Sequence, residues 1–191
     1  KKNKVELLDG FGKISGVNGR LRNVEVKDKD GKLITVTGKN VIIATGARAR
    51  LLPGIEPDGV SIWTYKEAMV PSALPKSLLI IGSGAIGVEF ASFYNDMGVD
   101  VTLVEVLDKI LPVEDQEIFL FAEQTFSKQG IKIKTSSKVL DLKKQAKSVD
   151  VSIETNGVVS SLKVDKVILA VGIIGNTEEI GLEGTKIKTE R

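Results

Sequence analysis

Apolar runs and helically spaced apolar positions alternate through the middle of the chain. Five segments follow one another in the order strand, helix, strand, helix, strand: residues 77–81, 84–97, 100–105, 112–129 and 131–134. The first is apolar almost throughout, as expected of a strand buried on both faces. In the first helix Ile86, Phe90, Phe93 and Met97 share one face. This order predicts a parallel α/β sheet.

Short β segments flank this middle part on both sides. They lie at residues 5–8, 13–17, 24–27 and 33–36 before it, and at 138–142, 149–154 and 158–164 after it. Turn signals such as Asp9-Gly10, Asn18-Gly19 and Asp30-Gly31 separate the earlier ones, which predicts an antiparallel meander. Residues 10–12, Gly-Phe-Gly, fit the same description and are most often a simple turn.

Each predicted meander leads into a similar apolar run. Residues 41–46 read Val-Ile-Ile-Ala-Thr-Gly, and residues 167–172 read Val-Ile-Leu-Ala-Val-Gly. Both runs predict a buried strand, and their similarity indicates two related dinucleotide-binding units. The βαβαβ half precedes only the second run, so we expect the first half of the other unit to lie upstream of residue 1.

The segment between the two parts, residues 47–75, is rich in proline and turn residues. We interpret it as a crossing between domains, with one short helix at residues 65–69. The single tryptophan, Trp63, is expected to pack this segment against the rest of the protein.

The composition excludes several kinds of partner and site but does not by itself indicate a function. The 191 residues carry 27 Lys and Arg against 25 Asp and Glu, a net charge of +2, with the two signs interleaved. We therefore expect no nucleic acid as partner, and because no apolar run approaches the ~18 residues of a membrane span, we expect no membrane either. Cysteine and histidine are both absent, which excludes thiolate metal sites and the commonest acid–base group from this stretch. We predict no catalytic and no metal-ligating residue in it.

The clearest motif is Gly82-Ser83-Gly84-Ala85-Ile86-Gly87, between a predicted strand and a predicted helix. In such a βαβ unit the first glycine makes the tight turn, the second lets a pyrophosphate approach the backbone, and the third lets helix and strand pack closely. The N–H groups of the helix N-terminus then face the phosphates. The motif predicts a dinucleotide site, the alternative being a glycine-rich turn without a ligand.

Glu105, at the end of the next predicted strand, indicates which dinucleotide is bound. A carboxylate there accepts hydrogen bonds from the adenine-ribose hydroxyls and repels a 2′-phosphate, by about 1 kcal/mol at ~4 Å in water and more in a cleft. Residues 106–110 hold no arginine, although Lys109 is near, so we predict NAD rather than NADP. Glu89 either complements the helix N-terminus or lies near the reacting ring, and both readings remain open.

With these residues, the chain resembles the dihydrolipoyl dehydrogenases, a branch of the pyridine nucleotide–disulfide oxidoreductases. The stretches that carry the resemblance are residues 10–13, 41–46, 79–89, 110–112 and 169–172. Glu105 points to the NAD-using branch, although residues 172–177 depart from the Arg and Pro found in many relatives. The resemblance implies a flavoprotein of 2-oxo-acid dehydrogenase complexes that passes electrons from dihydrolipoamide through a cysteine pair and FAD to NAD+.

The resemblance also implies further site residues. For NAD it adds Val139 beside the adenine, Gly172 near the nicotinamide end, and Glu89 beside the nicotinamide–flavin contact. For FAD, the second cofactor, it implies Gly12 and the Thr45-Gly46 turn. The redox cysteines, the first phosphate-binding loop and the His–Glu pair are absent from these 191 residues.

The sequence therefore predicts a Rossmann-like doubly wound α/β chain in three parts. Residues 1–70 form part of an FAD-binding domain, and residues 71–175 form the NAD-binding domain. In residues 176–191 the chain begins to return to the FAD-binding domain. We expect a central fragment of a cytoplasmic or mitochondrial-matrix homodimer whose partner is dihydrolipoamide on a lipoyl domain. The alternatives are a mercuric reductase, a soluble transhydrogenase, an NADH oxidase, or a nucleotide-binding module that is inactive on its own.

Overall fold

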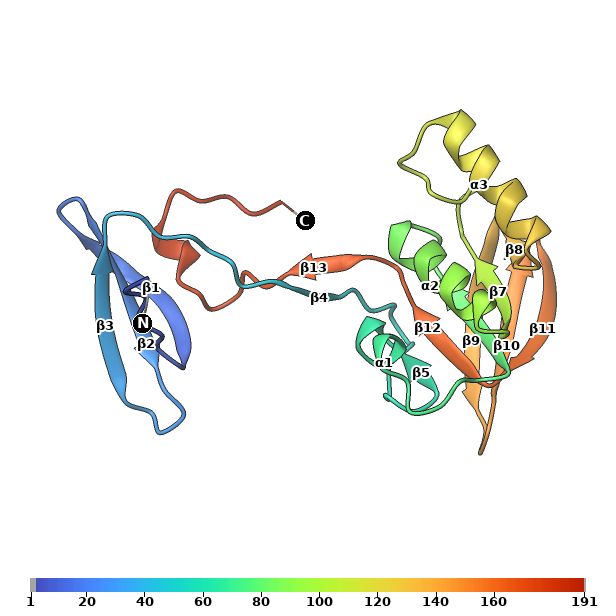
Figure 1. Ribbon diagram of the computed structural model, residues 1–191, viewed down its shortest axis with the longest axis horizontal. Coiled ribbons are helices and arrows are strands. Elements are labelled where there is room, and N and C mark those ends of the chain that lie inside the picture. The colour runs from blue at the N-terminus through green and yellow to red at the C-terminus, as the bar shows by residue number, and fades with distance from the viewer. Residues whose placement is uncertain (1–2, 191) are drawn as a thin grey trace. The chain divides into compact units, whose positions relative to one another are not determined.

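The structure, a computed structural model, describes residues 3–190 and divides into two compact units. One runs from Ala49 to Ile173, and the other combines the residues up to Arg48 with those from Ile174 onward. Figure 1 labels the elements of both units. These divisions differ from the predicted ones at 70/71 and 175/176, because the segment after Ala49 supplies a strand and core residues to the larger unit. Which cofactor each unit serves stays a prediction.

A five-stranded parallel sheet forms the centre of the larger unit. Its order is β5-β12-β6-β7-β8, with β5 (Ile62–Trp63), β12 (Lys166–Leu169), β6 (Ser77–Ile81), β7 (Asp100–Val104) and β8 (Lys132–Lys134). The helices are α1 (Tyr65–Met69), α2 (Ala85–Asp96) and α3 (Gln116–Lys128). The predicted strand–helix alternation and the short helix at 65–69 are confirmed.

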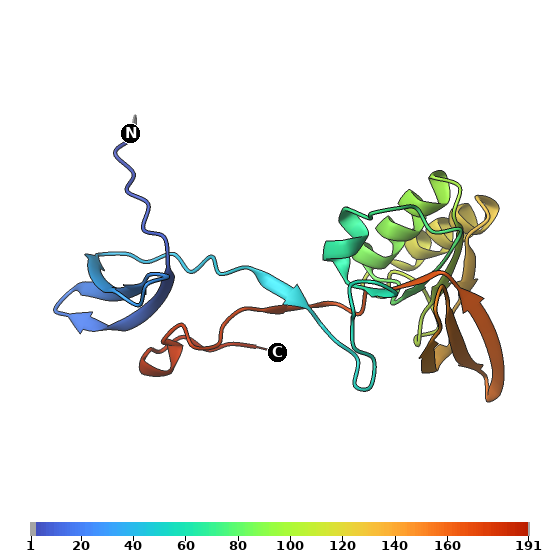
Figure 2. The same cartoon turned by 90° about the horizontal axis from the view of Figure 1, so that it is seen from below.

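The two faces of this sheet are covered by different layers. Leu78 and Ile80 of β6 belong to the core cluster shared with the helices, whereas Leu79 and Ile81 belong to the cluster shared with the meander. That meander is antiparallel in the order β11-β10-β9, formed by β9 (Ser137–Lys144), β10 (Val149–Thr155) and β11 (Val158–Val164). Figures 1 and 2 show the helices on one side and the meander on the other. The predicted fold class is confirmed, with the meander in the place that a doubly wound sheet gives to its second layer of helices.

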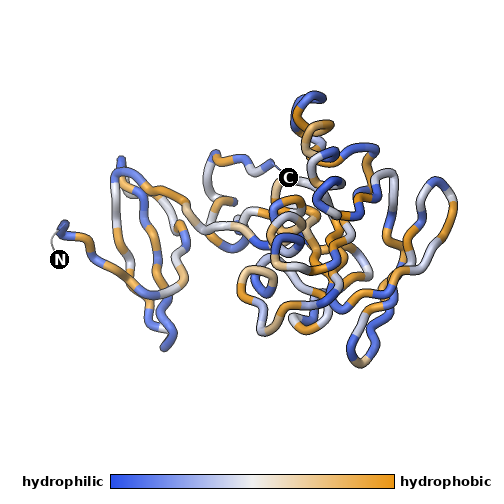
Figure 3. Tube along the Cα trace, turned by 45° about the vertical axis from the view of Figure 1, so that its right-hand side comes forward, coloured by the Kyte–Doolittle hydropathy of each residue, from blue (hydrophilic) through white to orange (hydrophobic). Residues whose placement is uncertain are grey.

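The burial of the central strands explains their mostly apolar sequence. Leu78, Leu79 and Ile80 are fully buried, and so are Val101 and Leu103 of β7. A parallel strand with a layer on each face has no solvent side, so its side chains are mostly apolar, and Thr102 of β7 is a buried polar exception. Figure 3 shows hydrophobic stretches of chain running through the interior of the larger unit.

Helix α2 packs only part of its predicted apolar face against the core. Phe93 and Met97 are each 52% exposed. The buried positions are Gly87, Val88, Ala91 and Tyr94. The Tyr94 hydroxyl donates to the carbonyl of Ala68 at 2.8 Å, which ties α2 to α1. The predicted helical spacing is correct: Ile86 and Phe90 of the predicted face are partly buried against the core, and the buried positions adjoin them on the helix.

Helix α3 is shorter than predicted. It begins at Gln116 with Asp115 as its N-cap residue and ends at Lys128, rather than spanning 112–129. Leu111 has a φ of 47°, and the N–H of Glu114 donates to its carbonyl at 2.9 Å. A left-handed residue followed by this turn cannot continue as an α-helix, so the acidic residues predicted for its first turn partly precede it.

The smaller unit contains the first meander. Its antiparallel strands are β1 (Phe11–Asn18), β2 (Leu21–Lys27) and β3 (Leu33–Gly38), and a short 3-10 turn, η1 (Leu182–Gly184), follows later in the chain. Residues 11–12, predicted as a turn, instead begin β1. The segment 5–8 was predicted as a strand and is not one, since it pairs with no strand among residues 3–190. Two further strands, β4 (Ala47–Ala49) and β13 (Ile173–Gly175), pair with each other.

The prediction of a buried strand at residues 41–44 is wrong. These residues form no strand and all are exposed, with Ile42 90% exposed. A strand requires neighbours that accept and donate its backbone hydrogen bonds, and no described segment pairs with this one. The similar run at 167–170 lies between β5 and β6, which supply those neighbours.

The crossing segment is held to the larger unit by a loop built on Asp58. Its Oδ1 accepts from the backbone N–H groups of Val60, Ser61 and Ile62 at 2.7–2.9 Å, and Lys144 lies 3.3 Å from Oδ2. Trp63, which follows, is buried as predicted, and its indole N–H donates to the carbonyl of Val60. The loop therefore sets the start of β5.

We expect the stability of the larger unit to fall as the pH drops from about 4 to about 2. Partial burial raises the pKa of Asp58, but the three backbone donors outweigh it and bring the pKa from 3.8 to about 2. A lowered folded-state pKa gives stability that is complete above the unfolded value and is lost as the pH falls through the folded one. After allowance for solvent screening the effect is about 1 kcal/mol.

Urea unfolding of the chain and of Asp58→Asn, followed through Trp63 fluorescence at pH 2 to 6, measures this effect. The variant should be less stable at pH 6, and the difference should shrink toward pH 2. A constant difference across that range would contradict the role given to the Asp58 carboxylate.

Candidate functional site: a cleft over the glycine loop

A cleft of about 920 Å³ opens where the glycine loop meets the ends of β6, β7 and β12. All of its lining residues belong to the larger unit. It lies beyond the carboxyl ends of parallel strands, where ligands of open α/β sheets bind. Of the residues predicted to contact NAD, those that line it are Gly82, Ser83, Gly84, Ala85, Ile86, Glu105, Val139 and Gly172.

The three glycines of the loop have three different surroundings. Gly82 has a φ of 100°, and a Cβ there would lie 2.5 Å from the carbonyl oxygen of Ala170. A Cβ on Gly87 would overlap the carbonyl oxygen of Gly82, so Gly87 allows α2 to pack onto the loop. A Cβ on Gly84 would meet no atom within 4 Å. The first and third glycines thus serve the fold, while the second leaves open space at the start of α2.

That open space fits the phosphates of a dinucleotide. Gly84 is the N-cap residue of the 12-residue helix α2, and no side chain caps this end. The first N–H groups of a helix lack intrahelical partners and carry partial positive charge, which favours an anion. Because glycine has no side chain, the space beside the first N–H groups stays open, and an anion can approach the backbone there.

The Glu105 carboxylate is held in place by the protein. It follows β7 and is 7% exposed. Its Oε2 accepts from both the N–H and the hydroxyl of Ser83, each at 2.8 Å, and its Oε1 accepts from the N–H of Leu107 at 3.0 Å. Sequence reasoning foresaw ribose hydroxyls as partners of Glu105 but not these three donors. A carboxylate offers about four acceptor sites, so a ribose hydroxyl has a place on Oε1.

Two of the predicted NAD residues lie away from the cleft. Gly87 is buried beneath the loop, and Glu89 is an exposed residue of α2 that does not line the cleft. Neither of the two readings of Glu89 is tested by this placement. The residues that line the cleft and that sequence reasoning missed are chiefly Arg50, Leu52, Pro53, Gly54, Ile55, Lys138 and Asp141.

The Thr45-Gly46 turn, predicted to bind FAD, is hydrogen-bonded to Asn176 of the smaller unit. Thr45 donates its hydroxyl to the carbonyl of Asn176 at 2.6 Å, and the Asn176 side-chain amide donates to the carbonyl of Thr45 at 3.0 Å. The N–H of Asn176 donates to the carbonyl of Gly46. Gly12 lies within β1 opposite Val26. Their role toward FAD stays a prediction.

An ion pair reinforces the same contact. Arg48 donates to both carboxylate oxygens of Glu178, at 2.7 and 3.0 Å, and to the side-chain oxygen of Asn176 at 3.0 Å. The hydrogen bonds from Arg48 are the main reason that the pKa of Glu178 falls to about 2. No sequence pattern indicates this pairing, because its members lie about 130 positions apart.

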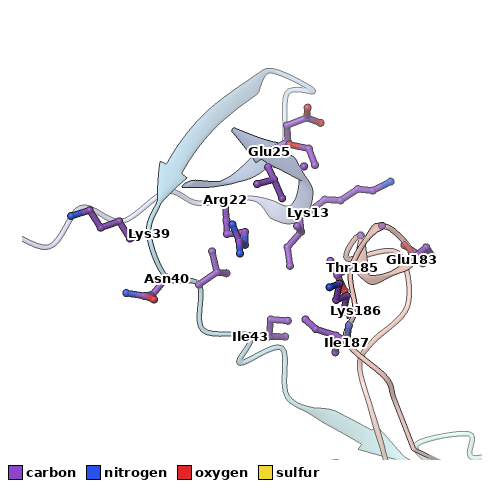
Figure 4. A pocket seen from close by; sticks show the side chains of 17 residues that line it. Lys13, Arg22, Glu25, Lys39, Asn40, Ile43, Glu183, Thr185, Lys186 and Ile187 are labelled. Atoms are coloured by element: carbon purple, nitrogen blue, oxygen red, sulfur yellow. Dashed lines mark hydrogen bonds between the residues drawn. The ribbon is translucent and has the colours of Figure 1, made fainter. Parts of the chain in front are cut away.

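The smaller unit has a hollow of its own, of about 1310 Å³. Figure 4 shows its side chains, with Arg22, Ile43 and Ile187 around the open space and Lys39 directed away from it. The predicted FAD residues Gly12, Thr45 and Gly46 are not among its lining residues. The hollow therefore gives no geometric support to that prediction.

Comparison with known proteins identifies the family. Residues 1–191 match the model of the pyridine nucleotide-disulphide oxidoreductases. This chain belongs to that family. Dihydrolipoyl dehydrogenase of Rhizobium etli is 50% identical over 202 residues, which cover 100% of this chain and 42% of that protein. The dihydrolipoyl dehydrogenase of Zymomonas mobilis is 44% identical, over 100% of this chain and 40% of its own length. The resemblance found in the sequence is confirmed.

Solved structures agree with the fold of this family member. LpdA of Mycobacterium tuberculosis superposes with a TM-score of 0.82 at 29% identity, covering 95% of this chain and 39% of that one. The HOCl-induced flavoprotein disulfide reductase RclA of Escherichia coli gives a TM-score of 0.77 at 25% identity, over 97% of this chain and 40% of RclA. The chain thus spans about two fifths of the length of these relatives.

Two further observations concern residues 3–190. No helix in this range is long and apolar enough to cross a membrane. Within the same range, no three acidic side chains gather in a way that could hold a metal ion.

Proposed function

We propose that this chain binds NAD(H) in the cleft over the glycine loop. The observation that carries the proposal is the open space at Gly84, the N-cap of α2, between two glycines that are needed for packing. The pyrophosphate would lie against the N–H groups of that helix, and the adenine ribose against Glu105. Val139 and Gly172 line the same cleft and would border the adenine and the nicotinamide end.

The whole protein, in this proposal, oxidises dihydrolipoamide on the lipoyl domain of a 2-oxo-acid dehydrogenase complex. This rests on the names of the relatives, both of them dihydrolipoyl dehydrogenases. When bound, FAD and NAD+ would supply the electron carrier and the final hydride acceptor, the electrons coming from dihydrolipoamide by way of a redox-active cysteine pair. The cysteines of that disulfide lie outside this chain, which has none. Its own residues bind and orient NAD, and the Thr45-Gly46 turn and Gly12 would contact FAD.

The main alternative is another reductase of the same family. The structural similarity to RclA, a flavoprotein disulfide reductase, keeps this alternative in view. Glu105 favours the NAD-using members, because its carboxylate is held by three hydrogen bonds and would repel a 2′-phosphate on an adenine ribose bound beside it.

We expect NADH to bind at least about 10-fold more tightly than NADPH, a difference of about 1.4 kcal/mol. Calorimetric titration of both nucleotides into the chain measures the ratio. In Glu105→Gln the negative charge is gone, so the ratio should fall toward one. Asp141→Asn removes another carboxylate from the same cleft and should keep the ratio. Equal affinities in the unchanged chain would refute the assignment of Glu105.

A further inference from the structure

The charged side chains that line the cleft differ in how many partners they have within the protein. Its acidic residues are Glu105 and Asp141, and its basic residues are Arg50 and Lys138. Three donors of the protein already surround the Glu105 carboxylate. Arg50, by contrast, makes no ion pair among the described residues. Lys138 likewise makes none, so the cleft holds two cations without an acidic partner among the described residues.

The neighbouring arginine shows what a paired guanidinium looks like in this chain. Arg48 donates to both oxygens of Glu178 and to Asn176. Two positions later, Arg50 lines the cleft and has no such carboxylate. An arginine without a partner beside open space is suited to an anionic ligand, because its planar fork matches phosphate oxygens.

The backbone places Arg50 on the Gly172 side of the glycine loop. The N–H of Arg50 donates to the carbonyl of Gly172 at 2.9 Å. Gly172 follows Ala170, whose carbonyl lies so close to Gly82 that a Cβ there would be 2.5 Å away. Arg50 is thus separated from the loop by one short stretch of backbone.

Lys138 lies on the other side of the loop. The N–H of Ser137, the preceding residue, donates to the carbonyl of Glu105 at 2.8 Å. The two cations of the cleft therefore flank the loop, with Lys138 on the side of the ribose-binding carboxylate. The glycine loop itself is where two phosphates would lie.

We infer that Arg50 is the counter-charge for the pyrophosphate of the bound dinucleotide. The inference rests on the proposed NAD(H) site and adds to it a residue from the crossing segment. The loop N–H groups and the N-terminus of α2 contact the phosphates from one side, and the Arg50 guanidinium pairs with them from the other.

The test compares three ligands and four variants of the chain. NADH and ADP-ribose both contain the pyrophosphate, and adenosine contains no phosphate. Arg50→Gln removes the charge, Arg50→Lys keeps it, Lys138→Gln removes the rival cation, and Arg20→Gln removes one in the other unit. Calorimetry measures NADH and ADP-ribose, and NMR titration measures adenosine. Thermal midpoints check folding.

Arg50→Gln should weaken NADH and ADP-ribose about 10-fold each and leave adenosine unchanged. Arg50→Lys should recover most of that loss, and Arg20→Gln should bind like the unchanged chain. If Arg50→Gln does not fold, the Arg50→Lys variant provides the test. Near-normal binding of NADH that weakens as salt is added supports the inference, and NADH binding that does not depend on salt overturns it.

Other results would overturn the inference while keeping the proposed function. A loss for NADH but not for ADP-ribose would place Arg50 at the nicotinamide end. A loss in Lys138→Gln with none in Arg50→Gln would give the phosphate role to Lys138. If the unchanged chain binds neither NADH nor ADP-ribose, the proposed function itself fails and the inference fails with it.

Discussion

Replacing Gly84 by valine should weaken NADH binding by at least about 100-fold, or about 2.7 kcal/mol, while the chain stays folded. Gly84 has φ −65° and ψ −178°, which any residue adopts, and a Cβ there meets no atom within 4 Å. The fold therefore accepts valine. The branched side chain would instead occupy the space that the phosphates need above the first N–H groups of α2.

Calorimetry with NADH and a thermal melt of the same sample measure both halves of this expectation. Gly184→Val is the matched control, because Gly184 also has open space around its Cβ but lies in the smaller unit. It should bind NADH normally. A Gly84→Val chain that binds NADH as tightly as the unchanged chain would show that no phosphate approaches this glycine.

Replacing Gly87 by alanine should destabilise the larger unit by about 3 kcal/mol or more. Glycine to alanine inside a helix normally stabilises by about 1 kcal/mol, so the sign here is diagnostic. In this chain the added Cβ would overlap the carbonyl oxygen of Gly82, a backbone atom rather than the end of a flexible side chain, so the backbone itself would have to shift. Overpacking of a buried backbone contact ranks among the costlier substitutions.

Urea unfolding followed by fluorescence of the single tryptophan, Trp63, reports on this unit. Asp96→Ala, at the exposed end of the same helix, should stay within about 0.5 kcal/mol of the unchanged chain. A Gly87→Ala chain as stable as the unchanged one would mean that helix and loop are not in contact as described.

Two similar sequences show how far the sequence could predict the fold. Residues 41–44 and 167–170 are both apolar runs that follow a meander, and pattern reasoning treated them alike. Only the second is a strand, because β5 and β6 provide its hydrogen-bond partners. A local apolar pattern indicates that a segment can form a strand, but whether it forms one depends on neighbouring strands that supply hydrogen-bond partners.

Helix α2 shows a second reason for error. Its spacing is correct, and Ile86 and Phe90 pack against the core, but Phe93 and Met97 of the same face are exposed while the small residues Gly87 and Ala91 are buried. A helix that packs closely onto a sheet uses small residues at the contact, and hydrophobicity does not reveal them. The glycine motif did contain this information, since the third glycine predicted close packing of helix and strand.

The candidate site was predictable where a motif carried it and not elsewhere. The glycine loop, Glu105, Val139 and Gly172 line one cleft. Arg50 and the Ser83 contact to Glu105 depend on how distant segments meet, which no spacing in the sequence encodes. Resemblance to the family supplied Val139 and Gly172, and only the folded chain adds Arg50.

The most direct test of the central claim is an NMR titration of the ¹⁵N-labelled chain with NADH. The account predicts saturable shifts of the amide signals of residues 82–87 and 105–107, with the signals of β1 to β3 unchanged. No saturable shift, or shifts confined to the smaller unit, would contradict the claim that NADH binds over the glycine loop.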